Sequence, residues 1–416
     1  MKKRILALAL CAVTAVGMTA CGNSKGETAE ATESVETTET PAVNLAKYDL
    51  NGEDYVKLCD YNAIPITIIG DYEVTDEDEK TFFEQWFESS GPFYREDTSK
   101  TVVEEGDIVN VDYVGKLDGE AFQNGTAQNQ NIDVSNNCAA GGGSGYIDGF
   151  TDDLLGAKVG DVIDSDVTFP EEYNNNADLA GKEVVFTFTV NSIQRELTLD
   201  EVDDEFASDE FGVDTVEEMH QEIKTYLEDS ASSSRTSDIY AALQNYLLEN
   251  CQVDMPKDYC ADVIEAVRNN FIQNYCAGDE ANMETMVKSY GYDSVEALEK
   301  EWESSVKNSI QLELIVKAIA AKENIKVEDS DFDNYVQNIV SGNGYGSTED
   351  LYSRYGYGDV TYGENQVRAV LLAREVLDHL SESAKITEQP AEDTESAEGT
   401  EAVESTEIID ATEEEN

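Results

Sequence analysis

The residue types that most often perform catalysis are scarce in this sequence. It has only two histidines, His220 and His379, and each lies in a stretch that we predict to be helical. A serine or cysteine nucleophile usually needs a histidine base beside it, and neither histidine has the context for that role. The glycine-rich stretch Gly141–Gly145 is followed by Tyr146 and Ile147, with no lysine to reach a phosphate. We therefore expect neither nucleophilic catalysis nor a nucleotide site.

The cysteines do not suggest a metal site. The chain has seven, and those after Cys21 include no Cys-x-x-Cys pair, the spacing that zinc sites commonly use. They are Cys59, Cys138, Cys251, Cys260 and Cys276. We interpret them as buried or free thiols, with a Cys251–Cys260 disulfide as the alternative. The sequence implies no metal and no other cofactor.

An aromatic and aliphatic set in the middle of the chain is the remaining candidate for chemistry. Residues 100–196 contain runs rich in strand-forming residues, which are Ile108–Tyr113, Val162–Phe169 and Val184–Ile193. In the last run Phe186, Phe188 and Val190 alternate with polar residues, which predicts a strand with one buried face. Asp118-Gly119 is typical of a tight hairpin turn. Because every β domain buries aromatic residues, the same set is also compatible with a plain core.

Helical patterns lie on both sides of this β-rich segment. On the N-terminal side, Thr75 can cap a helix whose first turn is acidic. The apolar stripe of that helix consists of Phe82, Phe83, Trp86 and Phe87. On the C-terminal side, apolar residues recur at helical spacing, as in NSIQLELIVKAIAAKE and QVRAVLLAREVLDHLSESA. We therefore predict a helical domain built from residues 47–99 and 197–385 around a β domain at 100–196.

The N-terminus has the form of an export signal. Basic residues at 2–4 precede a short apolar run, and Cys21 follows Met18-Thr19-Ala20, which resembles a bacterial lipobox. In such signals the cysteine becomes lipidated, and two acyl chains suffice for stable anchoring. We predict a signal peptide over residues 1–20 and lipidation of Cys21. An ordinary signal peptide with a chance cysteine is the alternative.

Both ends of the chain are poor in apolar residues and rich in acids. Residues 21–46 and 386–416 have the composition of disordered segments, and we predict a tether and a solvated acidic tail there. The whole chain has 89 acidic and 27 basic residues, for a net charge of −62. Because basic residues are needed to bind nucleic acids and anionic lipids, we expect no nucleic-acid partner and membrane contact only through the lipid.

Four stretches follow one another in order through the β domain. They are GDIVNVDYVGKLDGEAFQNG (106–125), GYIDGFTDDLLGAKVGD (145–161), VTFPEEY (167–173) and LAGKEVVFTFTVNSIQRE (179–196). Together they resemble the FKBP-type peptidyl-prolyl isomerases, and in particular the version inside trigger factor, the bacterial folding chaperone. Residues 55–66 and the helical region, with LLENCQVDMP at 247–256, are similar to other parts of that family. The resemblance implies an α+β fold, in which an FKBP-like antiparallel sheet with a short helix is flanked by an α-helical trigger factor/SurA-like chaperone domain.

The resemblance also implies a pocket for a proline-containing segment. Tyr113 would form a wall and donate its hydroxyl, and Phe122 and Phe188 would line the pocket. Phe150, on the short helix Asp152–Leu155, would be the floor. Rotation about a peptide bond faces a barrier of ~18–20 kcal/mol that comes from amide resonance. An apolar pocket favours the twisted amide, so the reaction needs no nucleophile.

The rim of that pocket is implied by the same match. Tyr146 and Ile147 would form it, and the N–H of Ile147 would donate to a substrate carbonyl. Tyr173 also falls in the matched region, with a less defined role. Gln123 departs from the family pattern, since many single-domain members have an aspartate there.

At the N-terminus the sequence departs from trigger factor, whose ribosome-binding domain has no counterpart here. We predict a membrane-anchored extracytoplasmic isomerase that also binds unfolded client chains and does not meet the ribosome. A non-enzymatic holding chaperone with a decayed isomerase domain is the alternative, and its candidate exposed contacts are Tyr352, Tyr355, Tyr357 and Tyr362. A solute-capture lipoprotein would need alternating strands and helices, which the sequence does not show.

Overall fold

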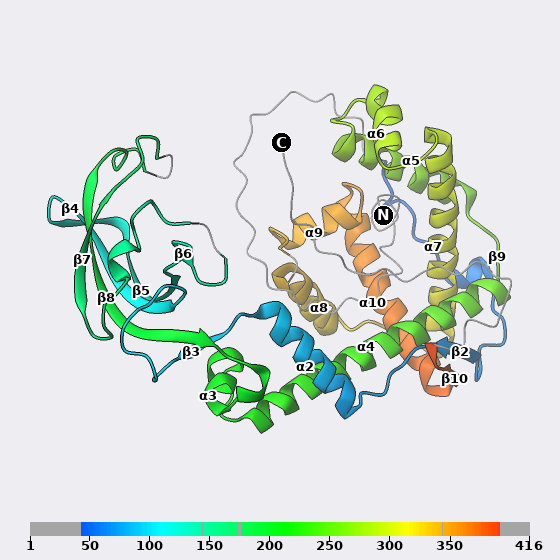
Figure 1. Ribbon diagram of the computed structural model, residues 1–416. Coiled ribbons are helices and arrows are strands. Elements are labelled where there is room, and N and C mark those ends of the chain that lie inside the picture. Colours follow the sequence, from blue (N-terminus) through cyan, green and yellow to red (C-terminus); the bar gives the residue numbers. More distant parts are fainter. Residues whose placement is uncertain (1–42, 143–144, 174–175, 343, 392–416) are drawn as a thin grey trace. The chain divides into compact units, whose positions relative to one another are not determined.

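A computed structural model describes residues 43–142, 145–173, 176–342 and 344–391 (Figure 1). The predicted signal peptide, Cys21 and most of the predicted tether and tail therefore lie outside the described residues. The chain divides into two compact units. One is Val74–Leu227, the sheet unit, and the other combines the segments up to Glu73 and from Glu228, the helical unit. The boundary falls inside one long helix, α4 (Val216–Asn250).

The sheet unit is built on an antiparallel sheet. Its strands are β3 (Tyr94–Glu96), β4 (Ile108–Leu117), β5 (Glu120–Asp133), β6 (Cys138–Ala139), β7 (Val162–Thr168) and β8 (Glu183–Glu196). They follow the order β3-β8-β4-β5-β6, and β7 pairs with β8 as well (Figure 1). Strands β4 and β5 meet at Asp118-Gly119, where φ is 53° and 89°. Positive φ at both positions is what a type I′ hairpin turn requires, so the predicted turn is confirmed.

Strand β8 shows the predicted alternation. Its inward residues are Val184, Phe186, Phe188 and Val190, all buried. The alternation then shifts by one residue: Val111 pairs with Val190 but Asn110 pairs with Ser192, which leaves Asn191 as a bulge. Ile193, rather than Ser192, is therefore the next buried residue. Because of the bulge, residues of β8 on both sides of Asn191 pack into the same hydrophobic core.

Helix α2 (Asp76–Ser90) begins at the predicted cap. The Thr75 hydroxyl accepts the N–H of Asp78, and the Asp78 carboxylate accepts the N–H of Thr75 at 2.8 Å, which completes a capping box. The aromatic stripe of α2 packs with Phe206 and Met219 in one core. That core includes residues of α3 (Asp204–Phe206), of η4 (Ala207–Phe211) and of the start of α4, and the short helix η3 (Leu199–Glu201) precedes α3 in sequence. Helix α2 and residues 197–227 thus belong with the sheet, and not with the helical unit as we predicted.

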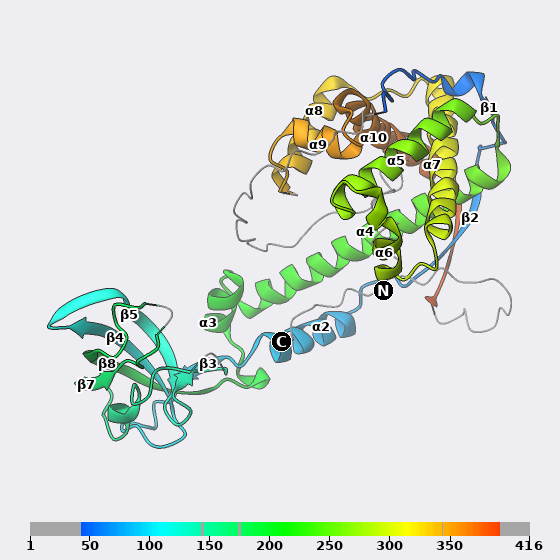
Figure 2. The same ribbon diagram turned by 90° about the horizontal axis from the view of Figure 1, so that it is seen from above.

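The helical unit is organised around helix α7 (Val295–Glu323). The other helices are η1 (Gly52–Asp54), α5 (Lys257–Tyr275), η5 (Glu280–Asn282), α6 (Met283–Ser289), α8 (Asp329–Gly342), α9 (Thr348–Tyr355) and α10 (Val360–Ser383). Trp302 and Leu314 of α7 pack with α5 in one core, while Ile315 and Ile319 pack with α4 and α10 in another. Figure 2 shows α7 alongside α5. A helix that is apolar on most sides is buried, which agrees with the strong helix predicted for this segment.

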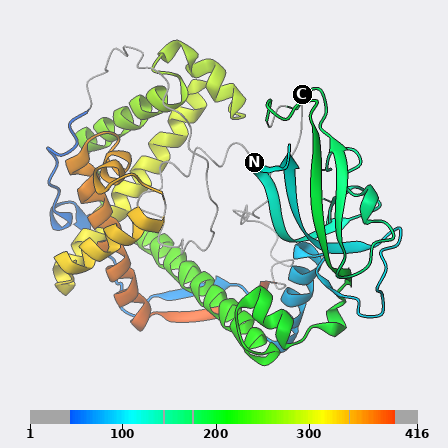
Figure 3. The same ribbon diagram turned by 90° about the vertical axis from the view of Figure 1, so that its left-hand side faces the viewer.

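Two short strand pairs tie together distant parts of the helical unit. Strand β1 (Val56–Lys57) is antiparallel to β9 (Gln252–Val253). Strand β2 (Pro65–Ile69) is parallel to β10 (Lys385–Gln389), and the two run side by side as the blue and orange-red strands of Figure 3. Residues 386–389 are therefore in a strand and not in the predicted tail, because their backbone pairs with β2. Leu45, which we placed in the tether, is fully buried in the core of α5 and α7.

Candidate functional site

A cavity of about 720 Å³ lies in the sheet unit. Its apolar and aromatic lining consists of Tyr113, Phe122, Tyr146, Ile147, Phe150, Phe169, Tyr173, Leu179 and Phe186. Gln123, Asn124, Asn176 and Asp178 add polar groups to it. The structure thus brings together all of the residues that we assigned to the pocket, with the exception of Phe188. A cavity with aromatic walls and a few polar groups is a usual form of a small-ligand site.

Phe150 is at the centre of the aromatic packing beneath this cavity. It is 3% exposed and lies in the turn before η2 (Asp152–Leu154), not on the short helix as we predicted. Tyr146 stacks on it with ring centroids 4.4 Å apart, and Phe186 meets it edge-on at 4.8 Å. Edge-on and offset stacking are the favoured geometries of aromatic pairs. The floor is therefore held by packing on both of its sides.

Phe188 is a core residue and does not line the cavity. Its side chain is 0% exposed, and its ring meets Phe150 edge-on at 5.0 Å and Tyr113 at 5.8 Å. It therefore supports the pocket residues from below. Our prediction was wrong because strand alternation shows which residues point inward but not which of them another side chain covers.

Two hydrogen-bond donors at the cavity are free within the described part of the chain. The Tyr113 hydroxyl and the backbone N–H of Ile147 make no hydrogen bond there. Burial raises the pKa of Tyr113, so its hydroxyl keeps its proton at neutral pH and can donate. Burial likewise raises the pKa of Tyr146. The cavity therefore offers neutral donors in an aromatic wall.

Two glycines make room for Phe122. A Cβ at Gly115 would lie 2.4 Å from the Phe122 ring and 2.6 Å from that of Phe186. A Cβ at Gly125 would also lie 2.4 Å from the Phe122 ring. All three distances are far below van der Waals contact, so strands β4 and β5 need glycine at these points to place the Phe122 ring in the cavity wall.

Asn137 fixes the rim. Its side-chain Nδ2 donates to the backbone carbonyls of Tyr146, at 3.2 Å, and Ile147, at 3.0 Å. The backbone carbonyl of Asn137 accepts the N–H of Tyr146 at 2.8 Å. The backbone of Asn137 has φ of 50°, which asparagine tolerates better than most residues. Three bonds from one residue therefore set the position of the two rim residues.

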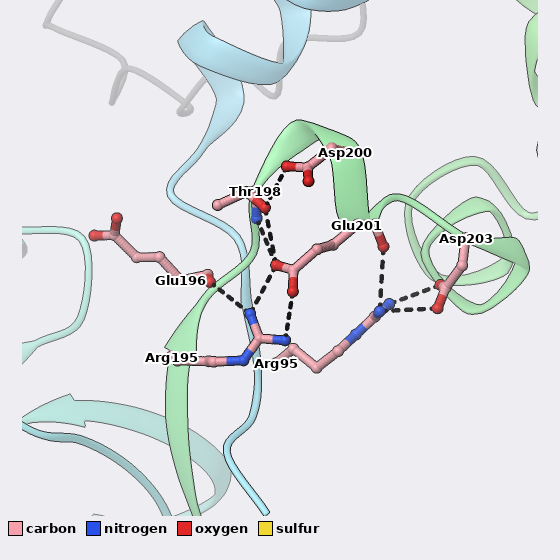
Figure 4. Close-up of polar contacts among 7 residues, drawn as sticks. All are labelled: Arg95, Arg195, Glu196, Thr198, Asp200, Glu201 and Asp203. Atoms are coloured by element: carbon pink, nitrogen blue, oxygen red, sulfur yellow. Dashed lines mark hydrogen bonds and ion pairs between the residues drawn. The ribbon is translucent and has the colours of Figure 1, made fainter.

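The sheet is attached to the segment after it by two arginine–carboxylate pairs (Figure 4). Arg95 of β3 makes two bonds to Asp203, at 2.7 and 2.8 Å. Arg195 of β8 makes two bonds to Glu201, also at 2.7 and 2.8 Å. Paired bonds of this kind fix geometry as well as charge. They hold the ends of the edge strand β3 and of its neighbour β8.

Comparison with known proteins agrees with this geometry. Residues 99–191 match the family described as FKBP-type peptidyl-prolyl cis-trans isomerase, and residues 215–382 match the bacterial trigger factor C-terminus. Trigger factor of Halothermothrix orenii is 33% identical over 72% of this chain and 66% of its own length. Trigger factor of Acetivibrio thermocellus is 29% identical over 83% of this chain and 79% of its own length.

This chain belongs to the trigger factor family. A solved trigger factor chaperone structure is also similar, at 18% identity and a TM-score of 0.41, over 79% of this chain and 72% of that one. The predicted α+β fold and the predicted FKBP-type isomerase domain are confirmed. All of the predicted pocket residues lie within the matched isomerase domain.

Part of the cavity was missed by reasoning from sequence. Phe186 was on the predicted inward face of β8 and Phe169 was inside the VTFPEEY motif, so a signal existed for both. Leu179 opens the fourth matched stretch, so a signal existed for it too, whereas Asn176 and Asp178 come from the loop before β8, where no pattern pointed to them. Asn137 had no signal at all, because its role depends on contacts across the glycine-rich stretch.

The predicted export and lipid anchor involve residues outside the described part of the chain. Among the described residues, no helix combines the length and the apolar character needed to cross a membrane.

Proposed function

We propose that this member of the trigger factor family is an exported peptidyl-prolyl cis-trans isomerase. It is held at the outer face of the cell membrane by a lipid on Cys21, and it assists the folding of unfolded, proline-containing chains. The observation that carries the enzymatic part is the aromatic cavity of the sheet unit, with two free donors at its wall and rim.

The cavity residues have distinct roles in this reaction. The rings of Phe122 and Phe150 enclose the proline and exclude water, which favours the less polar twisted amide over the planar one. The N–H of Ile147 donates to a carbonyl of the substrate backbone and holds the chain beside the pocket. The Tyr113 hydroxyl, whose pKa burial raises above its ordinary value, keeps its proton and supplies a second donor. No covalent bond forms or breaks in this rotation.

The decisive experiment is a refolding assay whose slow phase is limited by proline isomerisation, which takes tens to hundreds of seconds without a catalyst. The protein should accelerate that phase, and Phe122→Ala should abolish most of the acceleration. Tyr113→Phe removes only one hydroxyl and should slow it several-fold. Tyr226→Phe is the matched control, because Tyr226 is 53% exposed and does not line the cavity.

A non-enzymatic holding chaperone is the second candidate function. It is supported by the match of residues 215–382 to the trigger factor C-terminus. The tyrosines that we expected to be exposed contacts do not fit that role, since Tyr362 is buried and Tyr352, Tyr355 and Tyr357 are half-buried. If the wild-type protein prevents aggregation of an unfolded client but leaves the proline-limited phase unchanged, the isomerase proposal fails and this one stands.

The location rests on the N-terminal sequence. A basic start, a short apolar run and Met18-Thr19-Ala20-Cys21 support export with lipidation, and a protein outside the membrane would not meet the ribosome. Cells grown with a labelled fatty acid should incorporate label into the wild-type protein but not into Cys21→Ala. External protease should then degrade the wild-type protein in intact cells. Unlabelled protein that resists protease would overturn the proposed location.

A further inference from the structure

Cys59 and Cys251 lie against each other in the helical unit. Their Sγ atoms are 2.9 Å apart, and the N–H of Cys59 donates to Sγ of Cys251 at 3.3 Å. Cys59 is half-buried and Cys251 is 7% exposed. The Sγ atoms of a disulfide are about 2.05 Å apart. Only a small movement of the two side chains is therefore needed to bring these sulfur atoms to bonding distance.

The backbone around the two cysteines is already held together. Strands β1 and β9 pair Val56 with Val253 and Lys57 with Gln252. Continued by one residue, this antiparallel pairing would bring Leu58 opposite Cys251, so Cys59 lies one residue beyond that position. The contact between the cysteines is therefore fixed by a strand pair and does not depend on flexible side chains alone.

The two cysteines lie far apart in sequence, so a bond between them would close a long loop. Cys59 and Cys251 are 192 residues apart, and the whole sheet unit, Val74–Leu227, lies between them in sequence. A bond between them would close a loop that contains the entire sheet unit. Cross-links that close long loops restrict the unfolded chain most.

We infer that Cys59 and Cys251 form a disulfide that staples the helical unit where the sheet unit is inserted into it. The two thiols lose two electrons and two protons, and the oxidant is a second disulfide, of a small molecule or a protein, which is reduced to two thiols. Disulfides persist mainly in oxidising compartments outside the cytosol, so the inference agrees with the proposed export but is tested without it.

The other cysteines do not compete for this bond within the described part of the chain. Cys138, Cys260 and Cys276 make no recorded contact with another sulfur there. The Cys251–Cys260 disulfide that we left open from sequence is therefore not supported, since Cys251 faces Cys59. Burial raises the pKa of the Cys59 thiol, which makes its reactive thiolate scarce in the folded protein. We expect the bond to form mainly while the chain folds.

The test is to refold the purified protein with a mixture of oxidised and reduced glutathione and then digest it without reduction. Mass spectrometry should find the peptides of Cys59 and Cys251 joined, with the loss of two hydrogen atoms, and dithiothreitol should separate them. The melting temperature of the oxidised protein should fall on reduction. This comparison needs no variant, so it is not affected by a variant that fails to fold.

Variants then identify the residues. Cys59→Ser and Cys251→Ser should each abolish the cross-link and the effect of dithiothreitol on melting, whereas Cys276→Ser should keep both. The inference is overturned if both thiols remain open to alkylation in denaturant after oxidative refolding. It is equally overturned if either cysteine is joined to a different one. Neither result bears on the isomerase assay, which depends on the other unit.

Discussion

The side-chain amide of Asn137 holds the backbone carbonyl of Ile147, with 3.0 Å between Nδ2 and the oxygen. The two residues stand on either side of the glycine-rich stretch, whose Gly141 and Gly142 have φ of 86° and 88°. An antiparallel bridge between Cys138 and Gly145 closes this stretch. The glycines thus let the chain turn back, and Asn137 locks the returning backbone in the position where we propose that it meets substrate.

We predict that Asn137→Gly weakens catalysis more than folding. Glycine tolerates the positive φ of this position, so the change removes the side-chain bonds without adding strain. Two hydrogen bonds worth about 1 kcal/mol each would then no longer fix the rim, and we expect roughly a tenfold loss of kcat/KM for a proline-containing peptide. Urea unfolding of the same variant measures any general loss of stability.

Asn136→Gly is the matched control for that variant. Asn136 is exposed, and among the described residues its side chain bonds only to Asp133, so isomerase activity should be close to wild type. Equal losses in the two variants would mean that the loop matters only as a whole and that Asn137 does not position the rim.

The second prediction concerns the wall of the cavity. Gly115→Ala places a methyl group 2.4 Å from the Phe122 ring and 2.6 Å from the Phe186 ring, so at least one ring must move. We expect a large loss of isomerase activity and a loss of stability of about 1–3 kcal/mol, the usual cost of overpacking. Refolding kinetics and urea unfolding measure the two effects. Gly346→Ala, where a Cβ meets nothing within 4 Å, should change neither, and normal activity of Gly115→Ala would show that Phe122 is not needed in its present place.

The strands and helices with strong local signals could be predicted from the sequence. The inward face of β8, the cap at Thr75 and the hairpin turn at Asp118-Gly119 are all encoded by neighbouring residues, and each is found in the structure. The bulge at Asn191 could not be predicted, because it depends on how β8 pairs with β4. The strand β10 was missed for a similar reason, since its pairing with β2 joins segments more than 300 residues apart.

The cavity residues could be predicted only where they fall inside the motifs that match the family. Six of the seven residues assigned by position line the cavity, but Phe188 does not, because its cover by other rings is a property of tertiary packing. Asn137 contacts Ile147 across a loop, and Cys59 contacts Cys251, 192 residues away, and no local sequence pattern predicts either contact.

The third prediction is a dependence of stability on acid. Hydrogen bonds from Arg195, and then from Thr198, lower the pKa of Glu201 from 4.5 to about 2. A carboxyl whose pKa is lower in the folded state contributes stability above its unfolded pKa, and that contribution is lost as pH falls through its folded pKa. The free energy of unfolding of the sheet unit should therefore decrease between about pH 4.5 and pH 2, beyond the loss from other groups.

Urea unfolding at a series of pH values measures this effect. In Glu201→Gln the extra decrease over the same pH range should be missing, because the titrating group is gone. Glu196→Gln is the matched control, since Glu196 is exposed and its carboxylate makes none of the contacts in Figure 4. Identical pH profiles for the wild-type protein and Glu201→Gln would show that the Arg195–Glu201 pair does not stabilise the folded state.

The fourth prediction concerns the approach of helices α9 and α10. A Cβ at Gly363 of α10 would lie only 1.7 Å from the backbone carbonyl oxygen of Tyr352 in α9. Alanine in an exposed helix position is normally more stable than glycine by up to about 1 kcal/mol. Here the collision is with backbone, which cannot move aside as a flexible side chain can. We therefore expect Gly363→Ala to destabilise the helical unit by about 1–3 kcal/mol, measured by urea unfolding.

Gly342→Ala is the matched control. Gly342 is the last residue of α8 and a Cβ there meets nothing within 4 Å, so this change should be neutral or stabilising. If Gly363→Ala were also stabilising, the two helices could not be packed as closely as the structure has them.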